Sequence, residues 1–147
     1  MKRIAATTLA LAAIAALPAT LALAHSGPAK LFLHNTKVGK ILVNSRGYTV
    51  YAFSIDKPNR DVCVKIPLCL KAWPAVTTTG RPVAGPGLNQ SLLGTIKLKK
   101  GVEQVTYNGW PLYTYSQDTR PAETKYVNLL QFQGFWPALN AAGKTIK

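Results

Sequence analysis

The sequence predicts an all-β fold: a compact single domain of short strands and hairpins, built from two pseudo-symmetric repeats after an N-terminal signal peptide. Three observations predict it. Short β-prone runs alternate with turn residues through most of the chain. One Asn-Gly pair, Asn108-Gly109, separates two such runs. One block of sequence occurs twice, at residues 51–74 and again at residues 113–137.

Residues 1–24 are a predicted signal peptide. A basic start and an Ala/Leu/Ile-rich run lead to Ala22-Leu23-Ala24, the small residues of a cleavage site. The alternative is an uncleaved anchor, but Pro18 interrupts the run, and a spanning helix needs ~20 continuously apolar residues. We expect cleavage after Ala24, which leaves one secreted or periplasmic domain at residues 25–147 without a stable membrane span. No cysteine follows the leader directly, so we also expect no lipid attachment.

The chain is strongly basic. Without the leader it keeps 16 basic residues against 5 acids, a formal net charge of +11. Such a field attracts polyanions, which outside the cytoplasm are anionic envelope components, glycans or acidic proteins rather than nucleic acid. Lysines cluster only at Lys97, Lys99 and Lys100. Ile96 and Leu98 alternate with them, which favours the solvent face of a strand over a dedicated polyanion site.

Short β-prone runs begin just before repeat 1, which we place at about residues 41–81, and continue into it. We expect strands and a hairpin at residues 31–34, 40–43 and 48–53, with turn residues at 44–47. Pro58 and its Asp and Asn neighbours indicate a turn, and residues 69–73 fit one helical turn before Pro74. Residues 82–94 are rich in Gly and Pro, so we expect a connecting loop with little regular structure.

Repeat 2, at about residues 95–147, contains the Asn108-Gly109 hairpin. A type I′ turn needs positive φ at both central residues, which Asn-Gly supplies, so strands are expected on both sides. Pro111 lacks a donor for the strand ladder, which favours an edge position. Residues 126–135 are apolar and aromatic without a clear period, so strand and short helix both remain open.

The two blocks align position by position. Gly47-x-x-Val50-Tyr51-x-Phe53-x-x-Asp56 matches Gly109-x-x-Leu112-Tyr113-x-Tyr115-x-x-Asp118, and Trp73-Pro74 matches Trp136-Pro137. Two copies predict a pseudo-symmetric domain, because a stacked solenoid needs about three repeats. We expect the copies to superimpose strand on strand and tryptophan on tryptophan.

These residues resemble the bacterial secreted repeat family, predicted lipoproteins with a Tyr-x-aromatic-x-x-Asp motif. The resemblance rests on YAFSID and YTYSQD, on the cysteine pair ahead of LKAWP and on QVTYNGWPLY, and it covers about residues 41–139. It implies an exported all-β protein. It implies no activity, because the function of the family is not established, and this chain departs from lipidated members in having no attachment cysteine.

Cys63 and Cys69 are the only cysteines. In an exported chain they favour a disulfide, which would close a seven-residue ring and stabilise the fold by roughly 2 kcal/mol. A haem attachment needs Cys-x-x-Cys-His, and a zinc site needs more ligands than this chain offers. Metal thiolates and a redox pair are the remaining alternatives.

The motif aromatics have two interpretations. Alternate residues of a strand share a face, so each motif projects two rings the same way. The rings would build the core, because aromatics dominate burial, or they would form an exposed platform that stacks on sugars or other ligands. The residues concerned are Tyr51, Phe53, Trp73, Tyr113, Tyr115 and Trp136.

Asp56 and Asp118 occupy equivalent positions in the two repeats. If they faced each other across the pseudo-axis, they could share a proton as an acid/base dyad. Each precedes a proline-containing turn, which favours the ordinary role of a carboxylate that accepts backbone N–H bonds where a strand ends. We therefore expect Asp56→Asn and Asp118→Asn to lower stability modestly and independently.

Three functions remain. We favour a non-catalytic binding or structural module of the cell envelope, with a basic surface and no cofactor. The alternative is a periplasmic copper protein, in which cleavage frees the amine and imidazole of His25 to act with His34. An enzyme is disfavoured, because the sequence has no G-x-S-x-G, no phosphate loop and only five acids.

Overall fold

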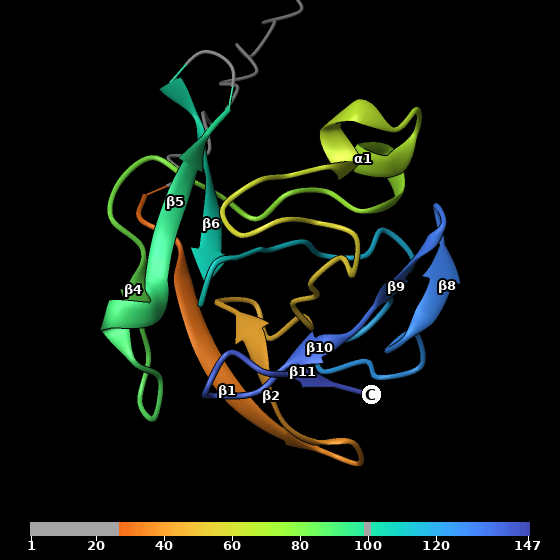
Figure 1. Cartoon of the computed structure of the whole chain (residues 1–147). Helices are drawn as coiled ribbons and strands as arrows, with labels where there is room; N and C mark the ends of the chain where they lie inside the picture. The colour runs from red at the N-terminus through yellow and green to blue at the C-terminus, as the bar shows by residue number, and fades with distance from the viewer. Residues whose placement is uncertain (1–26, 99–100) are drawn as a thin grey trace, which may run out of the picture.

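Four small β-sheets carry the fold in the computed structural model, which describes residues 27–98 and 101–147 (Figure 1). The described helices are single turns, and none is long and apolar enough to cross a membrane. The predicted all-β domain of short strands and hairpins is confirmed.

The first sheet is built on a long hairpin. β1 (Lys30–Thr36) and β2 (Gly39–Asn44) pair antiparallel. β4 (Val83–Ala84) lies parallel to the start of β1, where the Val83 and Gly85 amides donate to the Ala29 and Leu31 carbonyls. Thus β4, together with the 3-10 turn η2 (Gln90–Leu92), adds short regular elements to the predicted connecting loop.

Residues 48–53 do not form a full strand, although they were expected to. They make single bridges, from Thr49 to Val43 and from Tyr51 to Tyr113 and Ala138. The backbone partners of this segment come from several elements, so no continuous ladder forms.

The second sheet surrounds β6 (Glu103–Tyr107). It pairs with β5 (Leu93–Lys97) on one side and β3 (Thr77–Thr78) on the other, and its end continues into β7 (Trp110–Pro111). Asn108 and Gly109 have φ of 49° and 79°, as the type I′ turn requires. The predicted Asn-Gly hairpin is confirmed.

The two repeats differ in the segment before each tryptophan. Repeat 1 has a 3-10 turn, η1 (Cys63–Lys65), and the predicted helical turn, α1 (Cys69–Ala72). Repeat 2 has a hairpin, β8 (Leu129–Gln131) and β9 (Gly134–Trp136), followed by β10 (Ala138–Leu139) and β11 (Thr145–Ile146). The expectation that the copies match element by element is wrong here.

A close contact at Gly134 and the disulfide ring account for this difference. A Cβ at Gly134 would lie 2.5 Å from Cε2 of Phe53, so β9 runs against that ring only because glycine has no side chain. In repeat 1, Cys63 and Cys69 are bonded, and the chain turns at Leu68 into α1. Figure 1 shows α1 above the β8–β9 hairpin at the same end of the molecule.

Candidate functional site

Tyr51 and Tyr113, the central motif tyrosines, lie side by side in the interior. The Tyr51 amide donates to the Tyr113 carbonyl at 2.8 Å, and the Tyr113 amide donates to the Tyr51 carbonyl at 2.9 Å. Because equivalent residues of the two repeats pair with each other, a local two-fold pseudo-axis passes between them.

Each Trp-Pro segment crosses to the other repeat. The Pro74 carbonyl accepts from Thr114 at 2.9 Å, and the Pro137 carbonyl accepts from Ala52 at 3.0 Å. Thr114 and Ala52 each follow a motif tyrosine. The exchange is therefore reciprocal: the residue after each motif tyrosine donates to the Trp-Pro segment of the opposite repeat.

Four aromatic rings stack across the pseudo-axis, in the order Phe53, Trp136, Trp73 and Tyr115. Successive ring centroids are 4.0, 3.9 and 4.0 Å apart, and the two tryptophan planes differ by 2°. Tyr51 meets Trp73 edge-on and Tyr113 meets Trp136 edge-on, both at 5.2 Å. Offset and edge-to-face pairs of this kind are favourable beyond the area that they bury.

The stack lies in the core. Phe53, Trp73 and Trp136, like the two motif tyrosines, are fully buried, and Tyr115 is half-buried. An exposed aromatic platform would need accessible rings, so the motif aromatics do not form one.

Gln131, which lies outside the repeated motifs, binds both indoles. Its Oε1 accepts from Nε1 of Trp73 at 2.8 Å, and its backbone carbonyl accepts from Nε1 of Trp136 at 3.1 Å. One residue of β8 therefore serves both repeats, so the repeat pattern gives no signal for it.

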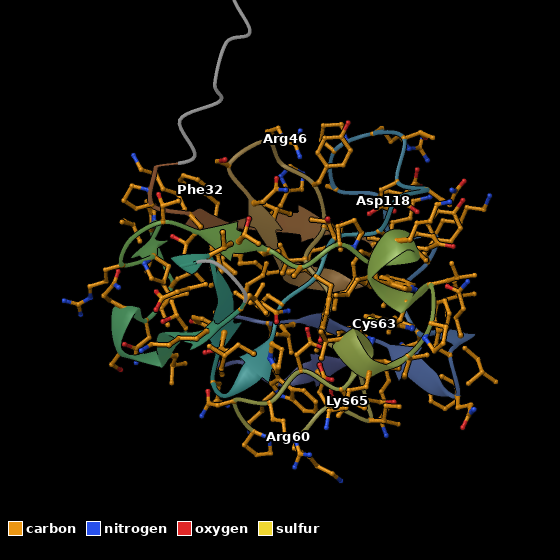
Figure 2. All side chains as sticks on the ribbon, turned by 90° about the horizontal axis from the view of Figure 1, so that it is seen from above. Phe32, Arg46, Arg60, Cys63, Lys65 and Asp118 are labelled. Atoms are coloured by element: carbon orange, nitrogen blue, oxygen red, sulfur yellow. A yellow bond between two sulfur atoms is a disulfide. The ribbon has the colours of Figure 1, made fainter. Side chains whose placement is uncertain are left out.

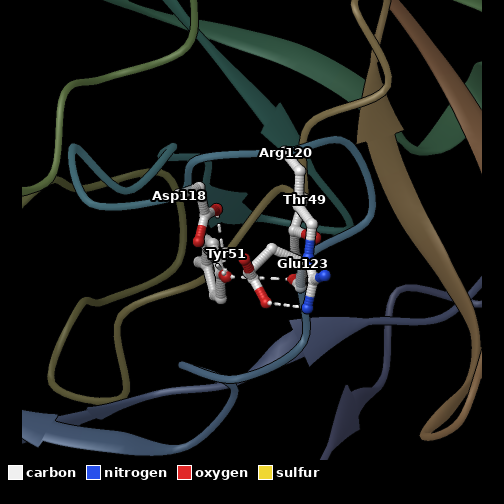
Figure 3. Close-up of polar contacts among 5 residues, drawn as sticks. All are labelled: Thr49, Tyr51, Asp118, Arg120 and Glu123. Carbon is white, nitrogen blue, oxygen red and sulfur yellow. Dashed lines mark hydrogen bonds and ion pairs between the residues drawn. The ribbon is translucent and has the colours of Figure 1, made fainter.

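The tyrosine hydroxyls also cross between repeats. Tyr113 donates to Oδ2 of Asp56 at 2.8 Å. Tyr51 lies 3.3 and 3.2 Å from the two carboxylate oxygens of Asp118 and 3.4 Å from the Glu123 carbonyl, as Figure 3 shows. An O–H···O bond is usually 2.7–2.8 Å long, so the first pair is the tighter one. The two aspartates bond to tyrosines rather than to each other.

Asp56 has a second partner, as expected of a residue at the end of a strand. Its Oδ1 accepts from the Val62 amide at 2.7 Å, and so ties the following turn to the motif. Among the described residues, the hydrogen-bond partner of the Asp118 carboxylate is the Tyr51 hydroxyl, so the expected bond from a backbone N–H is found at Asp56 and not at Asp118.

A second acid follows each motif aspartate by five positions. Asp61 accepts from the Val64 amide at 2.8 Å through Oδ1, while its buried Oδ2 has no hydrogen-bond partner among the residues that the structure describes. Glu123 pairs with Arg120 at 3.2 Å, and its backbone carbonyl accepts from Thr49 at 2.6 Å (Figure 3). Neither acid belongs to the Tyr-x-aromatic-x-x-Asp motif, but the equal spacing of Asp56-x4-Asp61 and Asp118-x4-Glu123 is a signal in the sequence that could have identified both.

Burial raises the pKa values of the motif aspartates and tyrosines. Desolvation raises the pKa of Asp56 to about 6, against the opposing bonds from Val62 and Tyr113, and the charge of Asp61 adds to the rise. Desolvation raises the pKa of Asp118 to about 7, with a further rise from Glu123. Burial also raises the pKa of both motif tyrosines, so these phenols stay protonated and donate.

Protons can reach one of these carboxyls from solvent. Asp118 borders a surface hollow of about 250 Å³, whose lining includes Arg46, Tyr48 and Tyr115. The site can therefore take up and release protons near neutral pH while it holds the two repeats together.

The disulfide is confirmed. Cys63 and Cys69 are bonded, with Cα atoms 5.5 Å apart, and both residues are fully buried beside the aromatic stack.

The candidate copper ligands fall at the edge of the described structure. His34 is exposed in β1, whereas His25 lies outside the described residues. Residues 27–98 and 101–147 contain no group of three His, Cys, Asp or Glu side chains that could hold a metal ion. The copper site stays a prediction, which electron paramagnetic resonance on protein that begins at His25 would test.

The family model for a secreted repeat of unknown function matches residues 33–77 and again residues 94–140, which together are more than half of the chain. The chain belongs to this secreted repeat family. The two matches contain both halves of the reciprocal site: Tyr51 and Asp56 in the first, and Tyr113 and Asp118 in the second. No curated protein and no solved structure matches the chain.

Proposed function

We propose that this secreted repeat protein is a non-catalytic binding module of the cell envelope, whose basic surface takes an anionic partner: an acidic envelope component, a glycan or an acidic protein. Nucleic acid is not the expected partner of an exported protein.

The segregation of charge carries this proposal. Every lysine and arginine in residues 27–98 and 101–147 is exposed, whereas none of the five acids is. Three acids are buried, namely Asp56, Asp61 and Glu123, and the other two are half-buried. Cations at the surface and acids in the interior make the outward field more positive than a random placement of the same residues would.

The raised pKa values act in the same direction. With Asp56 at about 6 and Asp118 at about 7, each carboxyl is partly protonated in slightly acidic surroundings, and the net charge becomes still more positive. Attraction to an anionic partner should therefore strengthen as the pH falls from 8 to about 6.

The mature form belongs to the same proposal. Cleavage after Ala24 would give a chain that begins at His25 and carries no lipid. Intact mass of the exported protein tests both points: the mass of unmodified residues 25–147 with one disulfide supports them, and any added acyl mass contradicts the second.

Binding to a soluble polyanion tests the function. We expect the mature protein to bind a sulfated glycan such as heparin and also poly-glutamate, with an affinity that falls steeply as sodium chloride is raised. A variant with Lys30, Lys37 and Lys40 changed to Gln should weaken binding to both polymers. No retention on either polymer at about 0.15 M salt would overturn the proposal.

A further inference from the structure

The loop that the disulfide closes exposes apolar side chains. Leu68 is 71% exposed and Val64 is 51% exposed, while Ile66 and Leu70 of the same segment pack against the aromatic core. Ile66 and Leu70 therefore contribute to the core, whereas the outward-facing Val64 and Leu68 do not.

Leu68 is also held in an unfavourable backbone conformation. Its φ is 65°, in the left-handed region, where a residue with a Cβ is disfavoured and Gly or Asn is the usual choice. Leu68 therefore costs the fold stability twice, because its apolar side chain is in water and its backbone is strained. Strain of this kind is found at functional sites, where the surrounding structure holds the residue in place. Here the bonded cysteines at both ends of the loop fix it.

Basic side chains surround these apolar tips. Val64, Lys65, Leu68 and Lys71 line one hollow of about 510 Å³. Val64 also lines a neighbouring hollow of about 740 Å³, together with Arg60 and Lys97. Because the two hollows share Val64 and Leu70, they form one continuous surface. We call it the disulfide-loop surface and define it as Arg60, Val64, Lys65, Leu68, Lys71 and Lys97.

Two acids lie near these cations, Asp61 and Glu103, and Glu103 is half-buried opposite Lys97 in the β5–β6 pairing. Asp61 lies between Arg60 and η1, but it is 7% exposed, and its Oδ1 accepts from the Val64 amide. Figure 2 shows Arg60 and Lys65 toward one edge of the molecule, with Cys63 further inside and Arg46 at the opposite edge. The disulfide-loop surface thus presents four cations and two apolar side chains.

We propose that the disulfide-loop surface docks the protein on an anionic lipid bilayer. Leu68 and Val64 enter the headgroup layer, and Lys65, Lys71 and Arg60 bind the lipid phosphates. This inference rests on the proposed function, because it names the anionic partner that the basic surface takes.

The pattern favours a bilayer over the other anionic partners. Exposed apolar groups flanked by lysine and arginine are what interfacial binding uses: the apolar groups insert, and the cations meet anionic headgroups. A soluble glycan would use the cations and leave Leu68 in water. The disulfide keeps the loop in shape before contact, so little ordering is needed on binding.

Sedimentation with lipid vesicles tests the inference. The mature protein should partition onto vesicles of phosphatidylcholine and phosphatidylglycerol, but not onto phosphatidylcholine alone. Leu68→Asn should lower the partition coefficient about tenfold, because it removes the inserting side chain while Asn suits the left-handed backbone. Val64→Thr should lower it less. Both variants should keep wild-type retention on heparin.

Leu130→Asn is the matched control. Leu130 is 62% exposed in β8 and lines neither hollow of the disulfide-loop surface, so this variant should partition like the wild type. If Leu68→Asn also partitions like the wild type, adsorption is by charge alone and the inference is overturned, while the polyanion proposal stands. Retention on heparin without vesicle binding overturns it too. Failure to bind both would remove the proposed function itself.

Discussion

Each motif tyrosine is completed by an aspartate from the opposite repeat. Tyr113 reaches Asp56 at 2.8 Å, whereas Tyr51 is shared among oxygens of Asp118 and Glu123 at 3.2–3.4 Å. The two sites are equivalent in sequence but not in hydrogen-bond strength. One short hydrogen bond to a buried carboxyl stabilises the fold more than a hydroxyl proton shared among several more distant acceptors.

Tyr113→Phe should therefore destabilise the protein more than Tyr51→Phe. We expect losses of about 2 and about 1 kcal/mol in the free energy of unfolding, measured by urea denaturation. Tyr107→Phe gives the comparison for a buried tyrosine outside the motifs, whose hydroxyl donates to the Ala141 carbonyl at 2.7 Å and accepts from the Asn89 amide at 3.1 Å. Equal losses at both motif tyrosines would show that the difference in bond length has no energetic consequence.

The raised pKa values of Asp56 and Asp118 link stability to pH. Both are above the ordinary value of 3.8, so between about pH 4 and pH 6–7 the folded protein holds protons that the unfolded chain has released. The free energy of unfolding should fall as pH rises through this window. Asp56→Asn and Asp118→Asn remove these contributions.

The gap in stability between wild type and either Asn variant should therefore be larger near pH 4 than near pH 8. Urea denaturation at the two pH values measures it, and the double variant tests whether the effects add. A gap that stays constant with pH would mean that neither carboxyl titrates differently in the folded protein.

At the scale of single residues, the sequence indicated the motif tyrosines and aspartates of the site but not how they pair. The alignment of the repeats selected Tyr51, Asp56, Tyr113 and Asp118, because equal spacing is visible in one dimension. It did not indicate that the pairs cross between repeats, since that depends on how the two copies pack. Gln131 serves both repeats from a single position, so no repeat pattern marks it.

Two turns show how far the local sequence determines the structure. Asn108-Gly109 was predictable because its positive φ values have a strong local signature. The β8–β9 turn was not, because Phe132 and Gln133 adopt φ of 54° and 65° without glycine or asparagine. There the tertiary contact of Gly134 with Phe53, and the bonding of Gln131 to both indoles, place the hairpin.

The disulfide should stabilise its loop and, through it, the core. Replacing Cys63 and Cys69 by Ala should lower the free energy of unfolding by roughly 2 kcal/mol from loop entropy, and further from the buried space that the sulfurs leave. Thermal unfolding measures the loss, and a variant of exposed Ser116 to Ala serves as a control. A double variant as stable as the wild type would show that the bond does not constrain the unfolded chain.

For the whole molecule, the two repeats share their core: each of the three clusters of buried apolar residues contains residues of both repeats. The four-ring stack alternates between them, the backbone at Tyr51 and Tyr113 pairs them, and each hydroxyl finds its acid in the other copy. The sequence predicted the repeats, the all-β class and the disulfide. It left open whether the aromatics are core or platform, and in the structure all of them except the half-buried Tyr115 are fully buried.

The amide NMR spectrum of residues 94–147 alone tests this shared core most directly. Without repeat 1, Trp136 loses Phe53 and Trp73, and Tyr113 loses both its backbone partner and Asp56. We expect a collapsed, poorly dispersed spectrum of an unfolded chain, unlike that of the whole protein. A well-dispersed spectrum that matches the repeat 2 signals of the whole protein would contradict the account, because it would show that one repeat builds its core by itself.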